Sequence, residues 1–156
     1  MKTARTPSSK RYSALLQLLR TADTLWNSSR IFFARWDLSP SQFNVLNLLN
    51  DKPDGMSQIE LGRRLIMHRS NVTGLIDRLE ARGLVRRKDA DRDRRAYRIV
   101  VTPAGARLLR QIVPQYYRLA EDVWNGFPVA TANRWENDLK RLSVNAGKIA
   151  TSKEAS

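Results

Sequence analysis

The chain has 156 residues, 42% of them hydrophobic, so it can form one domain with a core. Its net charge of +13 favours a polyanionic partner such as DNA, RNA or an anionic membrane. It contains no Cys, which excludes disulfides, thiolate metal sites and cysteine redox sensing. Its single His makes a histidine metal cluster and a Ser-His-Asp triad implausible.

Two further absences bear on the compartment. No apolar run approaches the roughly 18 residues that span a bilayer. The first ten residues are polar and basic and lack the apolar segment of a secretory signal. We therefore expect a cytoplasmic protein without a membrane partner.

The N-terminal part is predicted to be an arm followed by a long helix. Residues 1–9 form a basic, disordered arm that could lie on phosphates, although a frayed terminus is the interpretation we favour. Residues 10–37 carry apolar side chains at three- and four-residue steps, which indicates a helix. These side chains form two stripes, beginning at Tyr12 and Leu18. One helix of a small domain rarely needs two apolar stripes, so the second indicates a surface covered by something beyond the helix's own fold.

Two shorter helices are predicted to begin at capping boxes. In the first box, Ser39 and Gln42 satisfy each other's backbone groups, with Pro40 at the first helical position. Ser57 and Glu60 form the second box. The turn sequence between the two boxes ends the first of these helices.

A fourth helix and a hairpin follow. The helix is predicted from Arg69 to about Arg82, and Gly83 ends it as a left-handed C-terminal cap. Residues 84–88 and 94–101 are predicted as the two strands of the hairpin.

The C-terminal part is predicted to be helical. Thr102 and Pro103 repeat the pattern of a cap followed by proline and start a long helix. A last helix spans about residues 129–146, and residues 147–156 form a polar tail.

Positive charge concentrates in the centre of the chain. Between Arg63 and Arg98 there are 12 Lys or Arg against 5 Asp or Glu, so +7 of the net +13 falls in 36 residues. The predicted helix 69–82 within this region is about 21 Å long at ~1.5 Å per residue, which suits a DNA major groove.

The exposed side of this helix is predicted to have two parts. Its early exposed positions are small or polar and could approach base edges: Arg69, Ser70, Asn71, Thr73 and Gly74. Of these, Asn71 could pair with adenine and Arg69 with guanine or phosphate. Farther along, Asp77, Glu80 and Arg82 are interpreted as a solvated face with local ion pairs.

The tip of the hairpin is the sharper signal. Arg92, Arg94 and Arg95 alternate there with Asp91 and Asp93. A guanidinium at such a tip can enter the narrow, electronegative minor groove, and an adjacent carboxylate can hold it by paired hydrogen bonds. A charged turn that only keeps the hairpin soluble is the alternative, but the position after a helix-turn-helix disfavours it.

Several segments occur in a distinctive order: Leu38-Ser-Pro-Ser-Gln42-Phe43-Asn-Val45-Leu46, Ser57-Gln-Ile-Glu60-Leu61, Ser70-Asn-Val72-Thr73, Ile76-Asp77-Arg78-Leu79-Glu80-Ala-Arg82-Gly83-Leu84-Val85, Asp93-Arg94-Arg95-Ala96 and Val101-Thr102-Pro-Ala-Gly105. Over about residues 38–110 the chain thereby resembles the MarR (multiple antibiotic resistance regulator) family of winged-helix transcription factors. A motif set of this length and order is highly specific.

The resemblance implies a mainly α fold with a small β-hairpin wing. Residues 38–102 would form a winged helix-turn-helix DNA-binding lobe. The helix at 10–37 and those within 103–146 would form a homodimer, which would explain the second apolar stripe.

The resemblance also implies roles for individual residues. The recognition helix would contact double-stranded DNA through Arg69, Ser70, Asn71, Thr73, Gly74 and Arg78. The wing would do so through Asp93, Arg94 and Arg95, with Arg95 in the minor groove and Asp93 acting with it. Ser57 and Gln58 would contact phosphates at a helix N-terminus.

Two positions depart from the family's pattern. Gly74 stands where many members carry a basic residue, at a cost of roughly 1 kcal/mol in helix propensity relative to Ala. His68 stands where many members have an acidic cap. The DNA sequence that is recognised therefore cannot be carried over from the family.

Members often bind small aromatic acids between the dimer helices and the DNA-binding lobe. Side chains that could line such a pocket here are Trp26, Arg30, Phe33, Trp36, Phe43 and Tyr117. For each aromatic residue taken separately, the core or the dimer interface is the interpretation we favour.

Together these observations predict a dimeric, sequence-specific DNA-binding transcription regulator, a repressor in the first instance, released by a small-molecule effector. Its operator would be a pseudo-palindrome with half-sites about one helical turn apart. The alternative is a non-specific architectural DNA-binding protein without an effector. We expect no enzyme activity, cofactor or metal, because the chain has no nucleophile elbow, phosphate loop or metal-ligand spacing. RNA binding is disfavoured, because the chain lacks exposed aromatic platforms.

Overall fold

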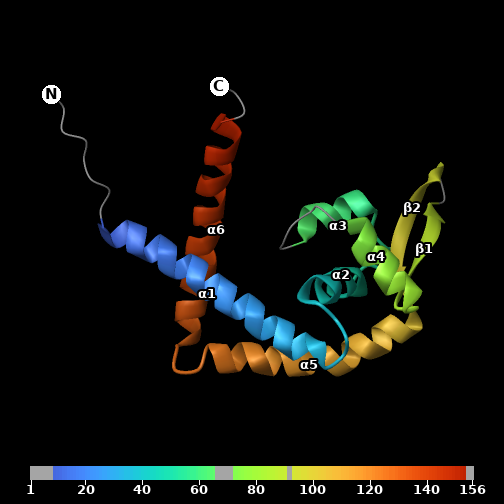
Figure 1. Cartoon of the computed structure of the whole chain (residues 1–156), viewed down its shortest axis with the longest axis horizontal. Helices are drawn as coiled ribbons and strands as arrows, with labels where there is room; N and C mark the ends of the chain where they lie inside the picture. The colour runs from blue at the N-terminus through green and yellow to red at the C-terminus, as the bar shows by residue number, and fades with distance from the viewer. Residues whose placement is uncertain (1–8, 66–71, 91–92, 154–156) are drawn as a thin grey trace. The chain divides into compact units, whose positions relative to one another are not determined.

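The computed structural model describes residues 9–65, 72–90 and 93–153 (Figure 1). In this part of the chain the elements are α1 (Ser9–Ala34), α2 (Pro40–Asn50), α3 (Gln58–Arg64), α4 (Val72–Ala81), β1 (Val85–Ala90), β2 (Asp93–Val101), α5 (Pro103–Val123) and α6 (Val129–Lys153). They confirm the mainly α fold with a small β-hairpin. The chain divides into two compact units, Met1–Arg110 and Gln111–Ser156, with the boundary inside α5.

The first unit is built around a core to which each of its elements contributes. In Figure 1, α2, α3 and α4 gather beside the β1–β2 hairpin. Near the end of α1, the Phe33 ring stacks on that of Phe43 from α2, with centroids 4.3 Å apart. The other fully buried large side chains of this unit are Val45, Leu46, Leu49, Leu61, Ile76, Leu79, Val85, Ile99 and Leu109.

The starts of α2, α3 and α5 follow the local sequence. Both predicted capping boxes are present, Ser39 with Gln42 and Ser57 with Glu60. Thr102 caps α5, since its hydroxyl accepts a hydrogen bond from the amide of Gly105 at 3.1 Å. These caps satisfy backbone donors that the first helical turn leaves without partners.

Helices α1 and α4 end in the same way. In α4, Gly83 (φ 65°) donates to the Glu80 carbonyl and Leu84 to the Leu79 carbonyl, which is a Schellman motif. Gly83 is thus the predicted left-handed cap. In α1, Asp37 takes the left-handed position (φ 52°), and its amide and that of Leu38 bond back to the last turn. This cap ends α1 at Ala34, three residues before the predicted end.

The wing is an antiparallel pair with one irregular step. The strands are in register from Val85 opposite Val101 to Asp89 opposite Tyr97, and the next pair is Ala90 opposite Asp93. Residues 94–96 of β2 therefore have no opposite residue in the regular ladder. At the base of the hairpin, Met56 exchanges backbone hydrogen bonds with Ile99, so the loop before α3 extends the sheet by one bridge.

The second unit contains the rest of α5 and all of α6. Three aromatic rings cluster at the turn between them, Trp124 and Phe127 from the turn and Trp135 from α6, with the two Trp centroids 5.8 Å apart. Helix α6 continues to Lys153, beyond the predicted end at Ala146. The predicted end rested on polarity, which does not stop an exposed helix, and Gly147 lies inside α6.

Candidate nucleic-acid interface

Helix α4 has one face in the core and one in solvent. Ile76 and Leu79 are buried, whereas Thr73, Asp77 and Arg78 are exposed. The structure therefore presents two of the predicted DNA-contacting residues, Thr73 and Arg78, on the outer side of α4. Gly74 is half-buried beside them. The predicted contacts Arg69, Ser70 and Asn71, and the departure at His68, lie outside the described residues.

Two of the acidic residues of α4 bind the wing. The guanidinium of Arg87 on β1 donates to the carboxylate of Asp77 at 2.5 Å and to that of Glu80. The Arg87 amide donates to Glu80 Oε1 at 2.9 Å. The hydrogen bond that Arg87 donates to Asp77, and then the charge of Glu80, raise the pKa of Arg87 above its ordinary value. Asp77 and Glu80 therefore lock α4 to β1, rather than forming the ion pairs along the helix that we expected.

Arg82, also expected in such local pairs, instead reaches the turn between α1 and α2. Its guanidinium donates to the backbone carbonyl of Trp36 at 3.0 Å and to that of Asp37. The Asp37 carboxylate is 3.8 Å away. Helix α4 is thus held at its C-terminal end by this turn and along its side by the wing.

The wing carries exposed basic side chains on the face that turns away from α4. Side chains alternate along a strand, and Arg87 faces α4, so Arg86 and Lys88 lie on the opposite face, where both are exposed. Asp93, Arg94 and Arg95 begin β2, at its irregular step. Their side chains lie outside the described part of the structure, so the predicted Asp93–Arg95 pair stays a prediction.

The predicted phosphate contacts lie at the start of α3. Ser57 and Gln58 are half-buried, and the Ser57 hydroxyl accepts from the Glu60 amide at 3.2 Å. In return Glu60 accepts from the Ser57 amide at 2.7 Å. The hydrogen bond from the Ser57 amide, and then that from the Ser57 side chain, lower the pKa of the Glu60 carboxyl, and the charges of Arg98 and Arg64 add to the effect.

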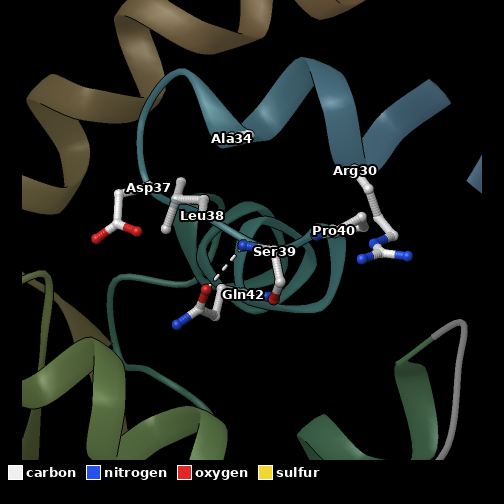
Figure 2. Close-up of a pocket in the computed structure, with 7 residues that line it drawn as sticks. All are labelled: Arg30, Ala34, Asp37, Leu38, Ser39, Pro40 and Gln42. Atoms are coloured by element: carbon white, nitrogen blue, oxygen red, sulfur yellow. Dashed lines mark hydrogen bonds between the residues drawn. The ribbon is translucent and has the colours of Figure 1, made fainter. Parts of the chain in front are cut away.

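A second, smaller feature is a surface pocket of about 300 Å³ where α1, the following turn and α2 meet (Figure 2). It is lined by Arg30, Ala34, Asp37, Leu38, Ser39, Pro40 and Gln42. In Figure 2, Arg30 and Asp37 lie at opposite ends of the lining residues, with the Ser39–Gln42 hydrogen bond between them. The side chain of Arg30 makes no hydrogen bond or ion pair with any other described residue.

The six residues predicted for an effector pocket lie in different parts of the structure. Only Arg30 lines the pocket just described. Phe33 and Phe43 are buried and stacked, so they belong to the core, as the more conservative interpretation had it. Trp26 and Trp36 are half-buried on or after α1, and Tyr117 is an exposed residue of the second unit.

Two features are absent from the described part of the chain. It contains no group of three or more His, Cys, Asp or Glu side chains that could hold a metal ion. None of its helices is long and apolar enough to cross a membrane.

Comparison with known proteins agrees with this architecture. A model of the MarR family matches residues 36–96, which run from the turn after α1 into β2 of the wing. The chain is 26% identical over 137 residues to the transcriptional regulator PapX of Escherichia coli, covering 86% of this chain and 84% of PapX. It is also 26% identical over 98 residues to the transcriptional repressor MprA of Escherichia coli K12, covering 63% of this chain and 56% of MprA.

A solved structure extends the similarity to the flanking helices. BpsR of Bordetella bronchiseptica, whose DNA binding is regulated by 6-hydroxynicotinic acid, superposes with a TM-score of 0.72 at 26% identity. The match covers 81% of this chain and 91% of BpsR. Residues 36–96 thus match the MarR family, and the comparisons together support a MarR-family winged helix-turn-helix transcriptional regulator.

Proposed function

We propose that this regulator binds double-stranded DNA as a homodimer and in a sequence-specific way, with α4 in the major groove and the wing beside it. The observation that carries the proposal is the way other elements hold α4 in place. Its outer side chains Thr73 and Arg78 are exposed, while Arg82 and Arg87 fix the helix to a turn and to the wing. A helix held at its end and along one side presents a defined surface, which base recognition requires.

Phosphate attraction would come from the surrounding basic residues. Arg63 and Arg64 at the end of α3, and Arg86 and Lys88 on β1, are exposed. In this proposal, Ser57 and Gln58 contact phosphates, and Arg95, with Asp93, enters the minor groove. Binding of this kind releases counterions, so it weakens steeply as salt rises.

Exposed apolar side chains support the homodimer. On α1, Tyr12, Leu15 and Leu19 recur at helical spacing and are each more than half exposed. Helix α6 exposes a further set comprising Trp135, Leu139, Leu142, Val144 and Ile149. Monomeric proteins seldom leave apolar stripes of this length in water, and a second copy of the chain would cover them.

Repression and an aromatic acid effector are the finer parts of the proposal. MprA is a repressor, and 6-hydroxynicotinic acid regulates DNA binding by BpsR. In this chain, Arg30 offers a guanidinium that pairs with no other described residue, at a pocket that also has apolar lining from Ala34 and Leu38. A carboxylate on a small ring would pair with that guanidinium.

The test is DNA selection followed by titration. The purified chain is used to enrich duplexes from a random library, and the enriched duplex and a scrambled one are compared by fluorescence anisotropy, with sedimentation to measure the oligomeric state. We expect a pseudo-palindrome bound by a dimer at least about 10³-fold more tightly than the scrambled duplex. Equal affinity for both would establish the architectural alternative, and a monomer bound to a single half-site would contradict the homodimer.

A further inference from the structure

The C-terminal ends of α1 and α4 meet through one side chain. Both helices end in Schellman motifs, α1 with Asp37 and α4 with Gly83 in the left-handed position. Arg82, directly before Gly83, extends from the end of α4 to the end of α1. There it donates to the carbonyls of Trp36 and Asp37, two consecutive residues of the α1 cap.

The contact is fixed in direction as well as in distance. A guanidinium is a planar fork, so bonds to two successive carbonyls set the orientation of both partners, which a single ammonium would not. The carbonyls of a helix C-terminus carry partial negative charge, which adds to the attraction. About two thirds of the Arg82 side chain is buried, with 32% exposed.

The same turn forms the wall of the pocket. Asp37, whose carbonyl Arg82 binds, lines the pocket together with the next two residues, Leu38 and Ser39. The turn is short and held in one conformation by its backbone hydrogen bonds, with Asp37 in a left-handed conformation that is costly for a residue with a side chain. A group that displaces this wall therefore either moves Arg82 with it or breaks the two hydrogen bonds from Arg82 to the turn.

We propose that Arg82 is the positioning residue that transmits the state of this pocket to the DNA-reading helix. With the pocket empty, the fork holds the end of α4 in the position that binds DNA. When the pocket is filled, the turn shifts, the fork carries the shift to α4, and operator affinity falls. The inference rests on the proposed function and deepens it, since it assigns the route from pocket to DNA.

A ligand is not needed to test this route, because a side chain can fill the pocket. Ala34 lines the pocket and is exposed, so Ala34→Trp places an indole at its wall. Arg82→Lys keeps the positive charge but removes the fork. Operator affinity, on the duplex that the wild type selects, is measured for the wild type, both single variants and the double variant, as a double-mutant cycle.

We expect Ala34→Trp to weaken operator binding by between about 5- and 150-fold, the usual range of coupling between sites. Arg82→Lys should weaken it as well, and in that background Ala34→Trp should cause little further loss. The slope of affinity against salt should stay unchanged in Arg82→Lys, because the variant removes no phosphate contact. Asn47→Trp, an exposed position of α2 that does not line the pocket, is the matched control and should have no effect in either background.

Two results would overturn the proposal. One is an equal fold-loss from Ala34→Trp in both backgrounds, which would leave Arg82 a merely structural contact. The other is unchanged affinity in Ala34→Trp with Arg82 present, which would leave the pocket uncoupled from DNA. Failure of the wild type to select any duplex would instead refute the proposed function itself, so the two failures are distinguishable. Thermal unfolding of each variant confirms that the compared proteins are folded.

Discussion

Replacement of Arg87 by Ala tests whether α4 and the wing are locked together by charge. The guanidinium bridges two carboxylates of α4, Asp77 and Glu80. In Arg87→Ala both carboxylates lose this partner and remain close to each other. The backbone hydrogen bond from residue 87 to Glu80 can persist, so the loss is confined to the side chain.

The expected size of the effect follows from exposure. A hydrogen bond to a charged group contributes about 1.5–3 kcal/mol, whereas an exposed ion pair contributes only about 0.2–1 kcal/mol. The side chains of Arg87, Glu80 and Asp77 are 27%, 34% and 56% exposed, so solvent screens both pairs partly. We therefore expect Arg87→Ala to lower the free energy of unfolding by about 1–2 kcal/mol.

The neighbouring residue provides a matched control. Arg86 has the same side chain in the same strand, but that side chain is exposed on the other face and bonds to no other described residue. Arg86→Ala should change stability by less than about 0.5 kcal/mol. Urea denaturation of the two variants, with the m-value checked for constancy, measures both effects. Equal destabilisation by the two substitutions would refute the claim that the bridge, rather than the general charge of the strand, stabilises the lobe.

Three further outcomes are expected. The pKa of Glu60 is lowered, so the contribution of this carboxylate to stability is present above the ordinary value of 4.5 and is lost as the pH falls through the lower folded value. Glu60→Gln should therefore flatten the acid side of a curve of stability against pH, while the Gln side chain still caps α3. Unchanged acid sensitivity in that variant would contradict the role of the box. Gly105→Ala should lower the free energy of unfolding by about 1–3 kcal/mol, because the added carbon would overlap the Leu84 carbonyl oxygen. Gly147→Ala should raise the free energy of unfolding by about 0.5–1 kcal/mol, because the space around the added carbon is open. Thermal melts that rank the two variants the other way would reject this packing. Arg95→Ala should weaken operator binding by roughly 1–3 kcal/mol and flatten its salt dependence, and an unchanged anisotropy titration would show that the wing makes no such contact.

Local signals predicted the helix starts and the wing well. A capping box spans four residues, so the starts of α2 and α3 could be read from Ser39 and Ser57. The end of α4 followed from Gly83, because glycine adopts the left-handed conformation without steric cost. The left-handed residue at the end of α1 is an Asp, which carries a weaker signal, and that helix was predicted three residues too long.

The partners of the arginines could not be predicted in the same way. A charge pattern along a helix reveals only neighbours three or four positions away. Arg82 binds carbonyls 45 and 46 residues earlier, and Arg98 binds the Asp54 carbonyl 44 residues earlier. Backbone carbonyls carry no residue-specific signal in a sequence, so nothing local distinguished Arg82 from a solvated basic residue.

The sequence by itself determined the class of protein. The order of helices, the basic hairpin and the motif set place the proposed recognition helix beside a wing, because each of these features depends on residues within a few positions of one another. Only the tertiary structure decided which contacts hold that helix in place and where the pocket lies. Phe33 and Phe43 pack together in the core, and the pocket forms instead around the turn that Arg82 binds. Both outcomes depend on the packing of α1, α2 and α4 against one another, which brings together groups that are distant along the chain.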